Sequence, residues 1–347
     1  MTAAATRAPS REGGAKIDLP PDYLVLGRAG SENFPVASRL LPAALRSDLM
    51  ALYGWARLVD QLGDDYAGDR LAALDEVERQ LRLELSPHGP GAEEEIHPLV
   101  SAIAETVRRL TLAPEPLFDL VQANRQDQSI SQYETFVDLV GYCKLSANPV
   151  GRMVLAIFGF ATPERIAWSD SICTALQLVE HWQDVAEDAI VGRVYLPMED
   201  MRRFGVTAEE LVPPPADYVD RGRRGAPGGA SVASRALLAF EAARARRMLD
   251  EGSPLVASLE GRLRFAVASF VAGGHAALDG LAALDFDVYA DPSRPGPVRF
   301  ASHLGRLLSR SYLGNTAYLG NTAYLGNMAY LRNTAYLRNK AHLGGTG

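Results

Sequence analysis

The chain contains little cysteine, and this narrows the class of protein to which it can belong. Among 347 residues only Cys143 and Cys173 are cysteines. Two cysteines exclude a disulfide scaffold, and neither lies in a Cys-x-x-Cys or Cys/His cluster with the spacing of a zinc site. We therefore expect two buried free thiols in a protein of a reducing compartment.

A long uncharged apolar run is also missing from the sequence. Residues 1–22 carry charged side chains with no apolar run after them, which is not the pattern of a secretory signal peptide. The most membrane-like stretch, residues 265–284, contains His275 and Asp279. Such groups are costly in a lipid-spanning helix, so we expect a buried helix there. These observations predict a cytoplasmic protein and leave contact with a membrane surface open.

Charge of one sign does not dominate the chain. Lys and Arg total 35 against 42 Asp and Glu, which gives a formal net charge of −7. A mildly acidic chain lacks the electrostatic footprint of a nucleic-acid-binding protein, and we expect no nucleic-acid partner. A local basic pocket for an anionic substrate remains compatible with this balance.

Stretches with the alternation of half-buried strands are few, whereas apolar residues recur at helical spacing. One example is the series Leu45, Leu49, Leu52, Ala56 and Val59. With 47% hydrophobic residues the chain can bury a substantial core. The pattern predicts an all-α fold.

Helix boundaries are marked by proline and by capping residues. We expect helices mainly over residues 31–204 and again over 231–284. The expected breaks lie at Pro42, at Ser86–Pro90, at Pro114 and Pro116, and at Thr162–Pro163, where Thr162 is a candidate N-cap.

Composition divides the chain into three parts. Residues 1–22 are predicted to form a flexible leader, residues 23–311 one helical domain, and residues 312–347 a low-complexity tail. Residues 213–230, rich in proline, glycine and arginine, are predicted to be a loop insertion in the domain. The tail repeats a six-residue unit beginning YLGNTA. Because six residues do not match a helical heptad, an apolar helical face would rotate away with each copy. We assign the tail no catalytic role.

Two pairs of aspartates share a four-residue spacing. Asp60 and Asp64 lie in YGWARLVDQLGDD, and Asp184 and Asp188 lie in QLVEHWQDVAEDAIVGRVYLP. On a helix, residues i and i+4 lie on one face, so each pair would bring two like charges about 6 Å apart. Magnesium takes carboxylate oxygens as ligands and links them to substrate phosphates. Two such helices facing each other would hold a diphosphate through metal ions.

Either pair alone could also consist of solvated surface acids that bind no metal, because acidic residues are common on exposed helix faces. The neighbouring residues favour the metal site. Arg57 lies three residues before Asp60, and Arg193 lies five residues after Asp188. Guanidinium groups bind phosphate oxygens in a matching planar geometry, so they suit an anion held through metal.

These segments resemble the aspartate-rich motifs of the squalene/phytoene synthase family, the head-to-head prenyl synthases. The resemblance covers residues 23–310 and includes the order and separation of the motifs. The further segments that match are ENFPVASRLLP (32–42), NRQDQ (124–128), YETF (133–136) and YCKLSANPVGRMVL (142–155). The fold implied by this resemblance is the single-domain, all-α isoprenoid synthase bundle around a central cavity.

The resemblance also implies roles for individual residues. Asp60, Asp64, Asp184 and Asp188 would be catalytic residues that hold Mg²⁺, and Tyr142 would take part in the carbocation chemistry. The residues that would bind the substrate are Ser31, Asn33, Phe34, Tyr53, Arg57, Ala147, Gly151, Gln177, Arg193 and Tyr195. The two small ones among them, at 147 and 151, would leave room for a long isoprenoid chain.

Within the family, the sequence is most similar to the bacterial branch that makes hydroxysqualene. The combination of ENFPVAS, RQDQ, SANPVGR and WQDV indicates this branch. It implies conversion of presqualene diphosphate and water to hydroxysqualene and diphosphate, in squalene and hopanoid biosynthesis. Mg²⁺ is then the expected cofactor, and no NADPH is expected because water rather than hydride ends the reaction. Other enzymes of the squalene pathway are the protein partners that this reading suggests.

Departures from the family pattern keep alternatives open. Gln61 stands where many members have a second aspartate. Glu180 stands where an asparagine is common, and it is a further, weaker candidate metal ligand beside Asp184. His181 is a candidate base, although a lone histidine is more often structural. One alternative is an enzyme that condenses two prenyl diphosphates to presqualene diphosphate, squalene or phytoene. The other is a non-catalytic partner subunit.

Overall fold

The computed structural model describes residues 17–26, 42–91, 94–214, 229–290 and 297–310. Within these ranges the secondary structure is helical, apart from one isolated bridge between Gln132 and Val194. The all-α prediction is therefore confirmed. Several predictions concern residues outside the described ranges: most of the leader, Ser31, Asn33, Phe34, the centre of the 213–230 loop and the six-residue repeats.

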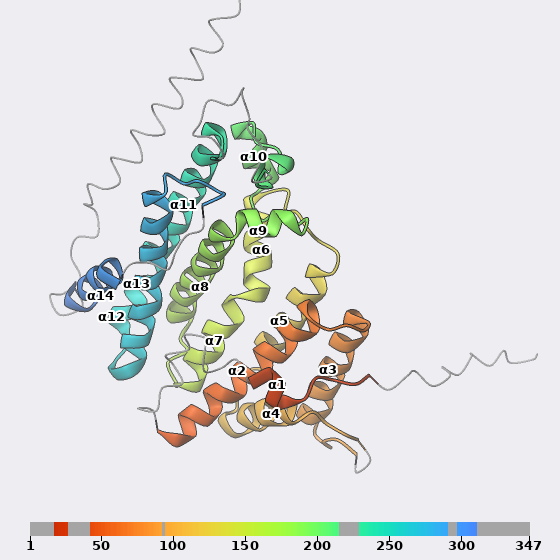
Figure 1. Cartoon of the computed structure of the whole chain (residues 1–347). Coiled ribbons are helices and arrows are strands. Elements are labelled where there is room, and N and C mark those ends of the chain that lie inside the picture. The colour runs from red at the N-terminus through yellow and green to blue at the C-terminus, as the bar shows by residue number, and fades with distance from the viewer. Residues whose placement is uncertain (1–16, 27–41, 92–93, 215–228, 291–296, 311–347) are drawn as a thin grey trace, which may run out of the picture.

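Figure 1 labels the helices in chain order. They are α1 (Asp22–Leu26), α2 (Ala43–Asp64), α3 (Arg70–Leu85), α4 (Pro98–Leu110), α5 (Glu115–Asp127), α6 (Phe136–Ser146), α7 (Asn148–Ile157), α8 (Pro163–Gln183), α9 (Val185–Ile190), α10 (Met198–Phe204), the 3-10 helix η2 (Ala208–Leu211), α11 (Val232–Gly252), α12 (Pro254–Ser258), α13 (Gly261–Ala283) and α14 (Pro297–Arg310).

Helix starts follow the capping residues and prolines of the sequence. The Thr162 hydroxyl accepts the N–H of Arg165 and caps α8, as the sequence predicts. Thr135 and Asp138 form a capping box at the start of α6. Because proline lacks an N–H, Pro149 near the start of α7 cannot continue α6, and the two helices meet at Ala147. These local signals fix where α6, α7 and α8 begin.

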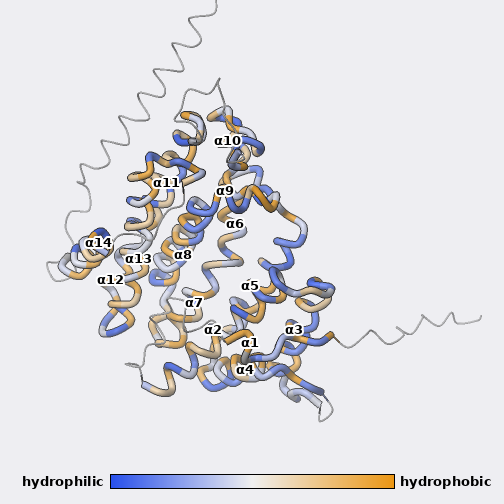
Figure 2. The backbone as a smooth tube through the Cα atoms, viewed as in Figure 1, coloured by the Kyte–Doolittle hydropathy of each residue, from blue (hydrophilic) through white to orange (hydrophobic). Residues whose placement is uncertain are grey.

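The core consists of two hydrophobic clusters. One gathers buried residues of α2, α3, α4 and α5, and the other gathers those of α6, α8, α11 and α13. Figure 1 shows α6 and α7 between these two groups of helices. Leu155 of α7 belongs to one cluster and Met153 to the other, so α7 joins them. Most helices show both polar and apolar colours along their length (Figure 2), as expected when one face is buried.

Helix α8 packs closely against α11 and α13, and glycines make this possible. A Cβ atom on Gly252 of α11 would lie 2.7 Å from the Trp168 carbonyl oxygen and 3.1 Å from the Ile172 backbone nitrogen. On Gly274 of α13 it would lie 2.8 Å from Leu176 Cδ2. At Gly252 the backbones of α11 and α8 can therefore approach only because a side chain is absent, and at Gly274 the glycine leaves room for leucine side chains. This packing fixes α8, whose C-terminal end leads into the second aspartate pair.

The segment from 231 to 284 is helical, as predicted. It forms α11, α12 and α13, with breaks at Ser253 and at Leu259–Glu260, and α13 begins at Gly261, which has φ +57°. Helix α13 is long and apolar enough to cross a membrane by length and composition, with 56% of its most apolar window buried inside the protein. A core helix meets the same criterion, in agreement with the expected buried helix.

The tight α8–α11 contact predicts opposite effects of two alanine substitutions. Gly252→Ala should lower the free energy of unfolding by about 1–3 kcal/mol, because backbone atoms of α8 must move to admit the methyl group. Gly273→Ala, at a helical position with nothing within 4 Å of the new atom, should raise it by roughly 0.5–1 kcal/mol. Urea denaturation measures both. Equal stabilities of the two variants would contradict the close packing.

Candidate active site

The first aspartate pair lies at the C-terminal end of α2. Asp60 and Asp64 are one turn apart on this helix, and both side chains are accessible to water. The Arg57 guanidinium lies 3.9 Å from an Asp60 carboxylate oxygen. Gly63, between the two aspartates, faces α5: a Cβ atom there would collide with the Asn124 amide. The end of α2 is thus held against α5 while its aspartates stay open to solvent.

The second pair lies at a helix junction, which the sequence did not predict. Helix α8 ends at Gln183, and Asp184, with φ −103° and ψ 13°, separates it from α9. The expectation that one helix carries both aspartates was wrong for this reason. The Asp188 N–H nevertheless donates to the Asp184 carbonyl over 2.8 Å, so the pair keeps a one-turn separation.

Arg193 connects the two aspartate pairs. Gly192 adopts φ +80°, a conformation that favours glycine, and it turns the chain after α9. The Arg193 N–H then donates to the Asp188 carbonyl over 2.9 Å. The side chain reaches Asp64, where the guanidinium nitrogen lies 3.6 Å from a carboxylate oxygen. Motifs that are far apart in sequence therefore meet at one place, as the sequence prediction requires.

Burial raises the pKa of four carboxyl groups around this place. Desolvation is the largest cause in each: it raises the pKa of Asp127 and Asp188 to about 6, that of Glu180 to about 7, and that of Asp184 above its usual value. The neighbouring carboxylates of Asp184 and Asp60 raise the pKa of Glu180 further. The carboxyl groups of the site therefore outnumber its two nearby guanidinium groups, those of Arg57 and Arg193.

Glu180 is accessible to water, but protein atoms surround its carboxyl group. Its side chain is exposed to water, although desolvation is the main cause of its raised pKa. Both facts hold together for a carboxyl group in a recess that water can enter and protein surrounds. Its electrostatic partners, Asp60 and Asp184, come from both aspartate pairs. The weaker metal candidate of the sequence thus lies between the two stronger ones.

An aromatic group borders the carboxylates. The ring of His181 stacks on that of Tyr195 with centroids 3.6 Å apart and planes 10° apart. Tyr142 lies 5.9 Å from Tyr195 and 5.5 Å from Tyr133, between ring centroids. The Gln177 amide nitrogen lies 3.3 Å from His181 Nε2. The predicted residues Gln177, Tyr142 and Tyr195 are therefore together.

The protonation states of this aromatic group follow from its burial. Desolvation, reinforced by Arg193, lowers the pKa of His181 to about 3, so its ring is neutral at ordinary pH. Burial raises the pKa of Tyr195 to about 12 and that of Tyr142 well above its usual range. These groups therefore present neutral rings beside the charged carboxylates.

Asp127 is a site residue that the sequence analysis did not single out. It accepts a hydrogen bond from the Tyr142 hydroxyl over 2.9 Å, and Arg193, Asp64 and Asp60 all act on its charge. Its segment NRQDQ resembles the family, but nothing in the sequence separates Asp127 from its neighbours. The fact that it ends α5 beside α2 is visible only in the structure.

The other residues of that segment hold α5 in place. The Gln128 amide donates to the Gly63 carbonyl over 3.0 Å, and the Asn124 amide donates to the Leu120 carbonyl over 3.2 Å. Arg125 points to the opposite side of α5 and donates to Asp75 of α3 over 2.6 Å. One short segment therefore places Asp127 in the site and anchors α5 to two helices.

The two small residues predicted to border the substrate lie near the α6–α7 break. Ala147 is the partly exposed junction residue itself. A Cβ atom on Gly151 would meet Ser169 Oγ and lie 2.6 Å from Cys173 Sγ, so this glycine is required by the packing of α7 on α8. Tyr53, also predicted to bind substrate, is a buried residue of α2. Roles of these three toward a substrate stay predictions.

The carboxylates suit Mg²⁺ in type but do not form a closed site. Carboxylate oxygens are the ligands that Mg²⁺ prefers, and it often takes only one or two from the protein beside phosphate and water. Within the described ranges, no group of three or more His, Cys, Asp or Glu side chains is placed to hold a metal by itself. The crowded carboxylates with raised pKa values fit a cation that a diphosphate helps to bind.

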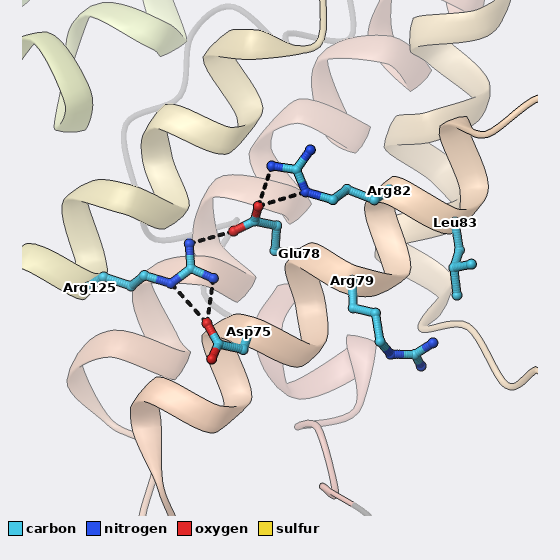
Figure 3. Close-up of a pocket in the computed structure, with 6 residues that line it drawn as sticks. All are labelled: Asp75, Glu78, Arg79, Arg82, Leu83 and Arg125. Atoms are coloured by element: carbon cyan, nitrogen blue, oxygen red, sulfur yellow. Dashed lines mark hydrogen bonds and ion pairs between the residues drawn. The ribbon is translucent and has the colours of Figure 1, made fainter. Parts of the chain in front are cut away.

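A pocket of about 510 Å³ lies elsewhere, on the outer face of α3 (Figure 3). Arg125 reaches across it to Asp75 and Glu78, and Arg82 donates to Glu78 over 2.8 Å. Arg82 and Arg125 are thus engaged by acids of the same pocket, and Arg79 pairs with Glu76 beside it. None of the site residues predicted from the sequence lines it. We take it as the seam between α3 and α5, distinct from the active site.

Comparisons with known proteins agree with this geometry. The family model for squalene/phytoene synthase matches residues 28–302. A hydroxysqualene synthase of Zymomonas mobilis is 36% identical over 52% of this chain, and the match spans only 59% of that protein. A hydroxysqualene synthase of Sinorhizobium fredii is 31% identical over 68% of this chain and 74% of the relative.

A phytoene synthase and a solved structure extend the comparison. The phytoene synthase of Arthrospira platensis is 29% identical over 75% of this chain and 82% of that protein. The crystal structure of squalene synthase HpnC from Alicyclobacillus acidocaldarius has a TM-score of 0.65 and 37% sequence identity, and it covers 76% of this chain and 94% of that one.

The raised pKa of Glu180 predicts how the metal-free protein responds to pH. A carboxyl whose pKa is higher in the folded than in the unfolded protein stabilises the fold below its unfolded pKa of about 4.3. That contribution is lost as the pH rises through the folded value of about 7. Glu180→Gln should therefore raise the free energy of unfolding near pH 8, by at most about 1 kcal/mol because the side chain is solvent-screened.

Urea denaturation in EDTA between about pH 4 and pH 8 tests this expectation. The wild-type protein should lose stability across the range more steeply than the variant. Glu105→Gln, at an exposed acid of α4 outside the site, is the control and should follow the wild type. Parallel curves for the wild type and Glu180→Gln would show that Glu180 is not desolvated.

Proposed function

Because the chain belongs to the squalene/phytoene synthase family, we propose that it converts presqualene diphosphate and water to hydroxysqualene and diphosphate. The family consists of enzymes that condense prenyl diphosphates. The observation that carries the proposal is the meeting of the two aspartate pairs, joined by Arg193 and bordered by an aromatic group. The relatives named hydroxysqualene synthase support the choice of this reaction within the family.

In the proposed reaction the charged residues bind the diphosphate end of the substrate. Asp60, Asp64, Asp184 and Asp188 would hold Mg²⁺, with Glu180 as a further ligand. When bound, Mg²⁺ would supply the positive charge that stabilises the departing diphosphate. Arg57 and Arg193 lie beside the aspartates, where their guanidinium groups can bind phosphate oxygens directly.

The aromatic residues would face the carbon skeleton. When the carbon–oxygen bond to diphosphate breaks, a carbocation remains, and ring faces attract cations without reacting with them. Tyr142 is held by its hydrogen bond to Asp127, and Tyr195 by its stacking on His181. Addition of one water to the rearranged cation, with release of a proton, gives the alcohol. No hydride donor is needed, so the proposal includes no NADPH.

A second candidate function is the condensation of two prenyl diphosphates. It is favoured by the phytoene synthase relative, whose match extends over 75% of this chain. The same aspartates and arginines would serve it, because a prenyl diphosphate also leaves diphosphate. We propose a cytoplasmic location for either reaction, with delivery of the apolar product to a membrane surface or to the next enzyme of the pathway.

Product formation by the purified protein tests the proposed reaction. With Mg²⁺ and presqualene diphosphate, and without NADPH, we expect hydroxysqualene among the extracted products. A parallel incubation with farnesyl diphosphate alone should give no C30 product. A product from farnesyl diphosphate would assign the condensing function instead. Lack of turnover in both, beside an active control enzyme, would favour a non-catalytic subunit.

Substitution of the aspartates tests their proposed role as metal ligands. Asp60→Asn and Asp184→Asn should each lower turnover at least about 100-fold, because each removes a charged ligand for the metal that stabilises the leaving group. EDTA should abolish turnover of the wild type, and added Mg²⁺ should restore it. Asp65→Asn, at an exposed acid next to the first pair, is the control and should stay within about twofold of the wild type.

A further inference from the structure

Two extended segments lie side by side and carry part of the active site. We call residues 131–135 and 194–197 the strap. Backbone bonds run from the N–H of Val194 to the Ser131 carbonyl over 2.8 Å and from the N–H of Met198, the first residue of α10, to the Tyr133 carbonyl over 2.9 Å. The strap carries Tyr133 and Tyr195, and Arg193 directly precedes it. The position of these three side chains therefore depends on how the strap is fixed.

Arg244 of α11 contacts the first turns of α6 and α10, the two helices that follow the strap segments. Its guanidinium lies 4.0 Å from the ring centroid of Phe136, the first residue of α6. It also donates to Asp200, in the first turn of α10, over 2.9 Å. Phe240, one turn earlier on α11, lies on the guanidinium at 4.7 Å. One side chain thus joins both helices that follow the strap to α11.

The charges around Arg244 are buried. Asp200 is 4% exposed and Glu241 is fully buried, and the guanidinium lies 3.2 Å from a Glu241 carboxylate oxygen. Arg203 approaches Asp200 from the solvent side at 4.0 Å. Desolvation raises the pKa of Glu241 to about 8, so this carboxyl is largely protonated at neutral pH. A partly buried arginine with defined partners in several elements has few alternative positions.

We propose that Arg244 is a positioning residue for the active site, which acts through the strap on Arg193 and Tyr195. Its guanidinium contacts Phe136, Phe240, Asp200 and Glu241, and none of these residues belongs to the aspartate pairs or to the aromatic group. Loss of its contacts frees the strap from α11. Because Arg193 binds the diphosphate in the proposed function, a displaced strap weakens diphosphate binding before it affects the overall fold. The inference rests on that proposed function only for the identity of the substrate.

The test compares two arginines of α11. Arg244→Met removes the contacts to the helices that follow the strap. Arg246→Met removes an ion pair of the same helix to Asp279, with a 2.6 Å separation, and does not touch the strap. The probe is inorganic diphosphate with Mg²⁺, titrated by calorimetry. Arg244→Met should weaken its binding by about tenfold or more, because misplacement by 1 Å suffices for large losses. Arg246→Met should bind as the wild type does.

Two further variants separate positioning from folding. Arg244→Lys keeps the charge but not the planar contacts, and it should bind diphosphate with intermediate affinity. Glu241→Gln leaves the contacts of Arg244 to Phe136 and Asp200 in place, and this variant should bind diphosphate as the wild type does. Thermal unfolding of each variant is measured alongside.

The outcomes distinguish this inference from the proposed function. Unchanged diphosphate binding in Arg244→Met would overturn the inference, whatever the enzyme turns over. Equal losses in Arg244→Met and Arg246→Met, in proportion to their lower melting temperatures, would also overturn it. A wild-type protein that binds diphosphate but leaves presqualene diphosphate unconsumed would reject the proposed reaction, while the role of Arg244 would still be decided by the binding data.

Discussion

Repulsion among carboxylates is the constraint on which the rest of the site depends. Six acidic side chains meet where α2, α5 and α8 end, and they are Asp60, Asp64, Asp127, Glu180, Asp184 and Asp188. Arg57 and Arg193 lie beside them at distances longer than a hydrogen bond. Carboxylates that lie close to one another disfavour each other's ionisation, and burial strengthens the effect. The arrangement persists because rigid packing elsewhere holds the helix ends together.

That packing is supplied by neighbours that carry no charge into the site. Gly252 and Gly274 bring α11 and α13 against α8, and Gly63 brings α2 against α5. The strap then fixes Arg193 relative to both aspartate pairs through backbone hydrogen bonds, which depend little on side-chain identity. The cost of gathering like charges is thus offset by contacts distributed over several helices. A diphosphate with its metal ions would relieve the repulsion at the place where it is greatest.

Features that depend on a few neighbouring residues, such as helix caps, could be predicted from the sequence. Thr162 caps α8 because a hydroxyl before proline satisfies a free N–H, and such a signal is visible in a short window. The aspartate pairs could be found by their spacing. The helix junction at Asp184 could not, because no glycine or proline marks it. Asp127 was missed for a different reason: its importance comes from Tyr142 and Arg193, which reach it only through tertiary packing.

The neutral state of His181 follows from the same packing, and it bears on the proposed chemistry. Its ring is stacked on Tyr195 and buried, and Arg193 nearby further disfavours a proton on it. A protonated imidazole at this place would set a positive charge beside the carbocation and raise the energy of that intermediate. A neutral ring leaves the carboxylates and aromatic faces as the groups that the cation meets. In the proposed reaction, burial of His181 therefore keeps a positive charge out of the site, because the same desolvation that lowers its pKa makes it a poor proton acceptor.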